Sequence, residues 1–384
     1  MKMYTFWPVG ALIALLLAAF STGSAIFLTA AVLVAAVTVT AAASVWWAAS
    51  TLAVSGELSQ RMIPRGGSVQ LSVEIRHRGW IPIAPMLVEI DAGPDAQGTA
   101  VRLKDAPGRR QRLSLPVQAT HVGVTRPGVT ACTVEDLFGI FCIRKTPRSA
   151  VGELVVLPLP FDTEELTYAP GDSGLETMAR ATEDITNPSD IRAYLPGDAL
   201  KKIHWKLSAR KRELVVRRFE EPVLPDGLVL MDCSPPPAQG HAEAEADVRD
   251  ALLETAASVM ASQMARDHAV RLPLLGAHPV ELEKGMGMPL ILEHLARVDF
   301  SETDRFERVL LLETRRMRRV GATVIISARL NGNMVDVMRR MRRMGPVIRL
   351  YLITSAPDDP QLLPMVSRLQ QGGVEVCYVD PSLS

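Results

Sequence analysis

The first fifty residues almost lack charge. Lys2 is the only charged side chain from Met1 to Ser50, although the 384-residue chain contains 42 Lys and Arg and 42 Asp and Glu. A chain with equal totals of opposite charge has no overall field that attracts nucleic acid, so we expect no nucleic-acid partner. The uncharged start indicates a hydrophobic segment, which is followed by a chain with the composition of an ordinary soluble protein.

Motifs that carry nucleotide, zinc or hydrolytic chemistry are also missing. The sequence contains no GxxxxGK[ST] phosphate loop, no GxGxxG after a strand, no GxSxG elbow and no HExxH pair. Four scattered cysteines form no CxxC pair, which argues against a disulfide framework and a zinc site and favours buried thiols: Cys132, Cys142, Cys233 and Cys377. We therefore predict no catalytic residues and a protein that is not an enzyme.

Two apolar runs occupy the uncharged start, from Tyr4 to Thr22 and from Ala25 to about Ala49. A membrane helix needs about 20 apolar residues, so we predict two membrane helices joined by a tight hairpin. A cleaved signal peptide explains the first run but leaves a second apolar run of full length. Lys2, Arg61 and Arg65 place both ends of the hairpin in the cytoplasm by the positive-inside rule. We expect a multi-pass protein of the cell membrane, in contact with the lipid bilayer, with cytoplasmic soluble domains.

The next part of the chain has a period of two residues. Short alternating runs separated by Gly and Pro predict strands at 68–76, 86–90, 112–117, 129–133 and 154–157. Short strands divided by turn residues are typical of a small all-β sandwich-like domain. Residues 168–187 are polar and rich in turn residues, which predicts a surface loop or linker.

The last part alternates strands with helices. We predict strands at 227–231, 269–274, 322–327, 347–354 and 374–379, and helices at 243–266, 289–298, 303–319, 334–344 and 361–371. Such alternation predicts an α/β domain with a mostly parallel sheet. The chain is thus expected to be multi-domain: two membrane helices (1–50), a β-rich domain (51–160), a linker and signature region (161–222) and an α/β domain (223–384).

Asp232 and Ser234 are the candidate metal ligands, because they directly follow the first strand of that sheet and ligands bind at the carboxyl ends of parallel strands. Their order resembles the start of the metal-ion-dependent adhesion motif DxSxS of the von Willebrand factor A-like fold, with Pro236 in place of the second serine. A carboxylate and a hydroxyl suit Mg²⁺. The later loops offer no convincing ligand threonine or aspartate, so the competing interpretation is that both side chains only hold their loop. No other cofactor is expected.

The stretch from Asp190 to Pro222 is strongly basic. Within it, eight cations fall in the eighteen residues 201–218 against one acid, Glu213: Lys201, Lys202, Lys206, Arg210, Lys211, Arg212, Arg217 and Arg218. Pro196-Gly197 predicts a tight turn and Asp198 a helix cap, and Ile203 and Trp205 are expected to pack a short helix onto a sheet. The cations predict a solvated face, a surface for anionic lipid or a docking surface. Further basic runs at 315–319 and 339–343 are expected on solvated helix faces.

This stretch also carries a family resemblance. The pattern Arg192-x-Tyr194-x-Pro196-Gly197-Asp198, followed by Ile203-x-Trp205 and Ser208-Ala209-Arg210, resembles the signature of bacterial membrane proteins of the domain-of-unknown-function 58 family. The segments 121–128 and 136–141 resemble the block that precedes it. Members are commonly encoded beside MoxR-type AAA+ ATPases, so the resemblance implies a MoxR-type AAA+ partner and a von Willebrand A-like α/β domain.

The function predicted from these observations is a membrane-anchored, non-enzymatic adaptor in envelope or chaperone-like assembly. The signature supplies the candidate docking residues: Arg192, Tyr194, Pro196, Gly197, Asp198, Trp205, Ser208 and Arg210. Internal pairing of Arg192, Lys206 and Arg210 with nearby acids is the competing interpretation. Two alternative functions remain open, a metal-dependent ligand-binding module and an unrecognised envelope enzyme built around the signature.

Overall fold

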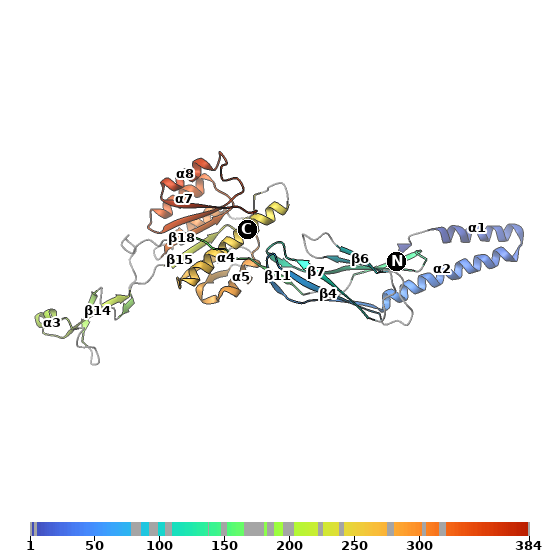
Figure 1. The fold of residues 1–384 in the computed structure, drawn as a ribbon, viewed down its shortest axis with the longest axis horizontal. Coiled ribbons are helices and arrows are strands. Elements are labelled where there is room, and N and C mark those ends of the chain that lie inside the picture. The colour runs from blue at the N-terminus through green and yellow to red at the C-terminus, as the bar shows by residue number, and fades with distance from the viewer. Residues whose placement is uncertain are drawn as a thin grey trace. The chain divides into compact units, whose positions relative to one another are not determined.

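We analysed a computed structural model of the chain. It describes residues 2–3, 6–77, 86–91, 99–103, 110–136, 138–146, 152–164, 180–182, 188–194, 203–221, 226–237, 242–274, 280–301, 305–314 and 320–382. The chain divides into two compact units, Met1–Pro158 and Leu159–Ser384 (Figure 1).

Two helices begin the first unit, α1 (Trp7–Thr22) and α2 (Ala25–Thr51). They are joined by Gly23 and Ser24 and contact one another. Gly23 has φ +65°, a conformation that glycine adopts without steric cost, which ends α1. In the described part of the chain, α2 is the helix long and apolar enough to cross a membrane, whereas α1 has only 16 residues. A helix of this kind near the N-terminus fits a membrane anchor and also a signal sequence.

The rest of the first unit is made of strands: β1 (Lys2–Met3), β2 (Leu52–Leu58), β3 (Met62–Pro64), β4 (Ser68–His77), β5 (Met86–Asp91), β6 (Thr99–Leu103), β7 (Arg110–Gln118), β8 (Gly123–Thr125), β9 (Gly128–Glu135), β10 (Phe141–Lys145) and β11 (Leu154–Leu157). They form sheets of order β1-β10-β9-β5-β6, β2-β4-β7 and β3-β11-β8. Alternate residues of β4 and β5 point into one shared core, which includes Leu71, Ile75 and Val88. Two sheets therefore bury their apolar faces against each other, as the alternating pattern predicts.

The second unit contains a small sheet of order β12-β14-β13. Its strands are β12 (Arg180–Thr182), β13 (Pro188–Ala193) and β14 (Val215–Glu221), and the short helix α3 (Trp205–Lys211) contacts β14. β12 falls inside the stretch 168–187 that sequence analysis assigned to a loop. That assignment was wrong for these three residues, which pair with the basic strand β14; the remainder of the stretch lies outside the described residues.

A larger sheet of order β17-β16-β15-β18-β19-β20 is the main feature of this unit. Its strands are β15 (Asp226–Met231), β16 (Val270–Leu274), β17 (Val280–Glu283), β18 (Val320–Ser327), β19 (Val347–Ile353) and β20 (Val374–Val379). Its helical segments are α4 (Ala242–Ala265), η2 (Lys284–Met286), α5 (Met288–Ala296), α6 (Phe306–Thr314), α7 (Gly332–Arg342) and α8 (Leu363–Gln371). All strand pairs are parallel except β16 with β17. The predicted α/β unit with a mostly parallel sheet is confirmed, and the antiparallel edge strand β17 was missed.

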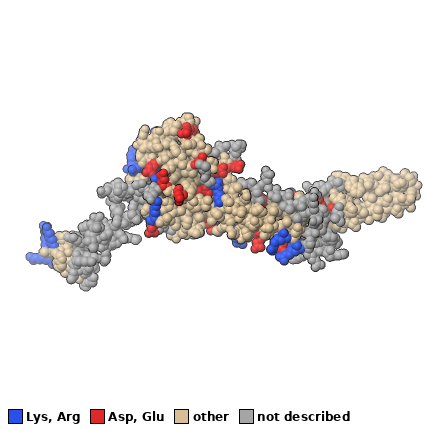
Figure 2. Space-filling model, viewed as in Figure 1, with Lys and Arg blue, Asp and Glu red and all other residues tan. Residues whose placement is uncertain are grey.

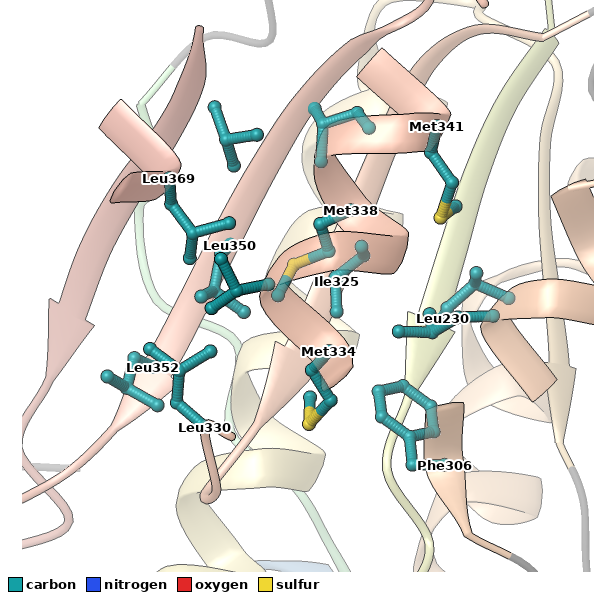
Figure 3. Packing of buried hydrophobic residues seen from close by; sticks show 14 of the residues in the cluster. Leu230, Phe306, Ile325, Leu330, Met334, Met338, Met341, Leu350, Leu352 and Leu369 are labelled. Carbon is teal, nitrogen blue, oxygen red and sulfur yellow. The ribbon is translucent and has the colours of Figure 1, made fainter. Parts of the chain in front are cut away.

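The core beneath α7 explains why these residues form these elements. β18 is buried along its whole length, as expected of a central parallel strand. Met334, Met338 and Met341 lie on one face of α7 at helical spacing, and Figure 3 shows them pointing toward the sheet residues Leu350 and Leu230. The Asn331 side chain accepts a hydrogen bond from the Met334 backbone N–H at 2.9 Å and caps α7.

Helix α6 offers a matched test of this core, because Leu310 is 0% exposed and Leu312 is 62% exposed in the same helix. We expect Leu310→Ala to lower the free energy of unfolding by about 2–5 kcal/mol, since it removes apolar contacts and leaves a cavity. The control Leu312→Ala should change it by less than about 0.5 kcal/mol. Urea unfolding of the detergent-solubilised full chain measures both, and equal effects of the two substitutions would contradict this packing.

Candidate functional site

The carboxyl ends of β15 and β18 meet at a reversal of strand order. The chain continues from β15 to β16 on one side and later adds β18 on the other side of β15. Loops that leave two neighbouring parallel strands in opposite directions leave a crevice between them, where open α/β sheets bind ligands. Asp232 and Ser234 follow β15 at this edge, and Ser327 ends β18 beside them.

Asp232 is 4% exposed and has hydrogen bonds to both carboxylate oxygens. Its Oδ1 accepts from the Ser234 backbone N–H at 3.1 Å and from the Ser234 hydroxyl at 2.6 Å. Its Oδ2 accepts from the Ser327 hydroxyl at 2.9 Å. The Ser327 hydroxyl in turn accepts from the Arg329 backbone N–H at 3.1 Å. These bonds join the loop after β15 to the loop after β18, and they satisfy a carboxylate that would be costly to bury without partners.

The crevice opens into a pocket of about 580 Å³. Its lining combines apolar, acidic, amide and basic side chains: Asp232, Ser234, Pro235, Arg305, Phe306, Glu307, Arg329, Asn331, Asn333 and Met334. Glu307 Oε1 accepts a hydrogen bond from Asn331 Nδ2 at 2.6 Å, so both acids of the lining have hydrogen-bond partners. Arg305 and Arg329 are exposed and form no ion pair with a side chain in the described part of the chain. The pocket therefore offers the guanidinium donors of Arg305 and Arg329 to a ligand.

Sequence analysis correctly brought Asp232 and Ser234 together but found no partner for them in the later loops. The structure adds Ser327, whose hydroxyl reaches Asp232 across the two strands. The available signal was that Ser327 is a polar residue ending the strand next to β15. Ser234 and Ser327 donate hydrogen bonds to both Asp232 oxygens, which is the arrangement that the loop-holding interpretation requires, and Pro236 offers no side-chain oxygen to a cation. The metal-site and loop-holding interpretations both stay predictions.

The signature residues are described only in part. Arg192 pairs with Val216 in the β13–β14 ladder, and its side chain lies outside the described residues, as do Pro196, Gly197 and Asp198. Tyr194 is half-buried, and its backbone N–H donates to the Leu214 carbonyl at 2.8 Å.

Trp205 does not pack α3 onto a sheet as predicted, because it is 63% exposed. Two other residues attach this short helix to β14. Ile203 is buried and forms a bridge with Val216, and the Ser208 hydroxyl accepts from the Val215 backbone N–H at 2.9 Å. Because these contacts attach the helix to β14, Trp205 in the first turn of α3 is not needed for packing and faces the solvent. Arg210 and Lys206 are exposed as well.

Two arginines outside the signature have structural roles. Arg342 donates from Nε to the Gly373 carbonyl at 3.0 Å, so the basic run at 339–343 is not only a solvated face; the run at 315–319 lies outside the described residues. Arg349 is 5% exposed and donates to Glu375 Oε2 and to the Glu164 carbonyl. Burial alone would lower the pKa of Arg349, but its hydrogen bonds to Tyr351 and Glu375 raise it. Arg349 was missed because it interrupts an apolar strand.

The structure defines a chain with an apolar N-terminal helix and an α/β unit with a parallel-rich sheet. We compared this chain with known protein families and structures. Residues 190–370 match the sequence profile of the family described as "Protein of unknown function DUF58". This match supports the family resemblance seen in the signature. A search of curated proteins found no match.

Solved structures give only distant similarities. Two structures of the GH20 exo-β-N-acetylglucosaminidase from Vibrio harveyi, one of an inactive mutant and one with N-acetylglucosamine, share 7% identity, with a TM-score of 0.22 over 85% of this chain and 75% of theirs. Cwp6 from Clostridium difficile shares 10% identity, with a TM-score of 0.19 over 85% of this chain and 49% of its own. Scores this low support no conclusion about fold or function.

The Asp232–Ser327 hydrogen bond can be tested against a matched exposed pair, in which the Ser301 hydroxyl donates to Asp299 at 2.8 Å. We expect Ser327→Ala to lower the free energy of unfolding by about 1–3 kcal/mol, because a buried carboxylate oxygen loses its donor. Ser301→Ala should have an effect below about 0.5 kcal/mol, since water replaces the hydroxyl. Urea unfolding of the full chain compares the two, and a neutral Ser327→Ala would show that this bond does not hold the loops together.

Proposed function

We propose that the protein is a membrane-anchored, non-enzymatic adaptor whose α/β unit binds a partner protein at the crevice between β15 and β18. The main support for the proposal is the presence in one chain of α2, which is long and apolar enough to cross a membrane, and of an open pocket with apolar and charged side chains in its lining at a strand-order reversal. The family resemblance names the partner, a MoxR-type AAA+ ATPase, and the setting, envelope or chaperone-like assembly.

A von Willebrand A-like fold for the α/β unit is part of this proposal. Its support is the six-stranded order with one antiparallel edge strand, β17, together with Asp232 and Ser234 directly after the central strand β15. Pro236 departs from the adhesion motif, and the Asp232 oxygens already accept from Ser234 and Ser327. The proposed adaptor therefore recognises its partner through protein side chains of the pocket.

As part of the membrane anchor, we propose that α1 crosses the membrane as well as α2. The two helices contact one another, and residues 4–22 together approach the length that a span needs. Lys2, Arg61 and Arg65 flank the pair and favour a cytoplasmic location for both units by the positive-inside rule. A cytoplasmic α/β unit is accessible to an ATPase in the same compartment.

The test of the adaptor is co-purification of the detergent-solubilised full chain with a MoxR-type AAA+ ATPase, the partner that the family resemblance implies. We expect binding by the wild type and a loss of about thirtyfold in affinity for Arg305→Ala/Arg329→Ala, because an arginine at the centre of a protein interface can contribute about 1 kcal/mol, and two contribute about 2 kcal/mol. Arg340→Ala, an exposed arginine on α7, is the matched control and should bind like the wild type. Absence of wild-type binding would refute the adaptor, and unchanged binding by the double variant would remove the pocket from the interface.

A metal-dependent ligand-binding module is the second candidate, favoured by the contact of Asp232 with Ser234 at the strand end. A bound ion stabilises the folded state in proportion to the logarithm of its concentration. We expect the same melting temperature for the full chain in Mg²⁺ and in chelator, because Ser234 and Ser327 already occupy Asp232. A higher melting temperature in Mg²⁺ that disappears in Asp232→Asn would establish the metal-dependent module instead.

A further inference from the structure

The residues around α3 form an exposed surface of unusual composition, which we call the α3 surface. It consists of Trp205, Lys206, Ala209, Arg210, Arg212 and Leu214. Trp205 is 63% exposed and Leu214 is 45% exposed, and the other four are also exposed. Figure 2 shows Lys and Arg side chains gathered over α3 with uncharged atoms beside them. Large apolar groups and cations thus face the solvent together.

The α3 surface is presented by a helix that is firmly attached on its other side. The Ser208 hydroxyl is buried against β14 and accepts from the Val215 backbone N–H, and the His204 backbone N–H donates to the Val215 carbonyl at 2.8 Å. Arg212 then adopts φ 59°, the left-handed conformation that commonly follows a helix. The exposure of Trp205 is therefore a property of a fixed helix rather than of a frayed end.

The charged side chains of the α3 surface have no ion-pair partner among the described residues. Lys206, Arg210 and Arg212 form no ion pair with a side chain in the described part of the chain. Glu213 is the only acid from Ile203 to Val216. The surface is thus net cationic, and the internal pairing considered for Lys206 and Arg210 is not seen among the described residues. A complementary binding partner must be anionic.

The composition of the α3 surface favours a membrane as its partner. Trp prefers the headgroup region of a bilayer, and each Lys or Arg near an anionic leaflet adds attraction. A tether also raises the effective concentration of the bound surface, so weak contacts suffice.

We propose that the α3 surface binds the anionic headgroups of the bilayer in which α2 is anchored, with Trp205 and Leu214 entering the interface and the three cations contacting headgroups. This inference rests on the membrane anchoring in the proposed function. It assigns Arg210 a lipid partner and leaves the crevice between β15 and β18 for the protein partner. Docking of α3 on the bilayer would hold the α/β unit at the membrane surface.

The experiment reads the environment of Ala209 in the full chain. Ala209→Cys, in a background in which the half-buried Cys377 is replaced by Ser, is labelled with a polarity-sensitive fluorophore. The labelled chain is incorporated into nanodiscs of phosphatidylcholine alone or of its equal mixture with phosphatidylglycerol. We expect a blue shift in the anionic discs only, reversed by high salt, because screening weakens the headgroup attraction.

Variants that remove cations from the α3 surface measure how strongly each charge contributes to docking on the anionic bilayer. Arg210→Gln should lower the ratio of docked to undocked surface about fivefold, and replacement of Lys206 and Arg212 as well should abolish the shift. Arg340→Gln on α7 is the matched control and should leave the shift unchanged. A label at exposed Asn333→Cys reports on another part of the same unit and should show no lipid dependence.

The outcomes separate the two proposals. A chain that does not co-elute with discs overturns both the anchoring and the lipid surface. A chain that incorporates but shows no shift, or shows the same shift in neutral and anionic discs, overturns the lipid surface alone and leaves the adaptor standing. A shift that requires added MoxR-type ATPase identifies a protein on the α3 surface and likewise overturns the lipid proposal.

Discussion

Residues 228–231 of β15 pair in parallel with residues 323–326 of β18, so both strands reach the same edge of the sheet together. This register places Asp232 opposite Ser327, although 95 positions separate them in sequence. The buried carboxylate requires hydrogen-bond donors, and the two hydroxyls supply them. The crevice, its pocket and the orientation of the loops that line it all depend on this pairing, because a shift in register would separate Asp232 from its donors.

Seen this way, the adhesion-like sequence after β15 has a structural explanation that needs no ion. Ser234 turns back onto Asp232 and Ser327 reaches it from the next strand, so the carboxylate is fully engaged by protein groups. The pocket lining also contains Arg305 and Arg329, which are exposed and form no ion pair with a side chain among the described residues. Guanidinium groups bind carboxylates and other anions, so these two side chains suit the anionic side chains of the partner in the proposed interface.

Sequence periodicity was sufficient to predict those helices and strands in which the spacing of apolar residues decides which side chains are buried. The strands predicted at 322–327 and 68–76 and the helix predicted at 334–344 each match an observed element, since local spacing alone indicates which residues are buried. β17 was missed because four residues carry too little pattern. Ser327 was missed as a partner of Asp232 because contact across strands depends on strand order, which a single sequence does not contain.

The error at Trp205 has a different origin. An apolar residue in a predicted helix was assumed to face a core, but α3 has seven residues and its attachment to β14 is already provided by Ile203 and Ser208. A helix this short has only a few positions that face β14, and Trp205 does not occupy one of them. An exposed Trp costs apolar hydration in the free protein, and the cations beside it form no ion pair among the described residues. Its presence is explained when a surface outside the chain covers it. In the proposed lipid contact, the headgroup region of the bilayer provides this cover.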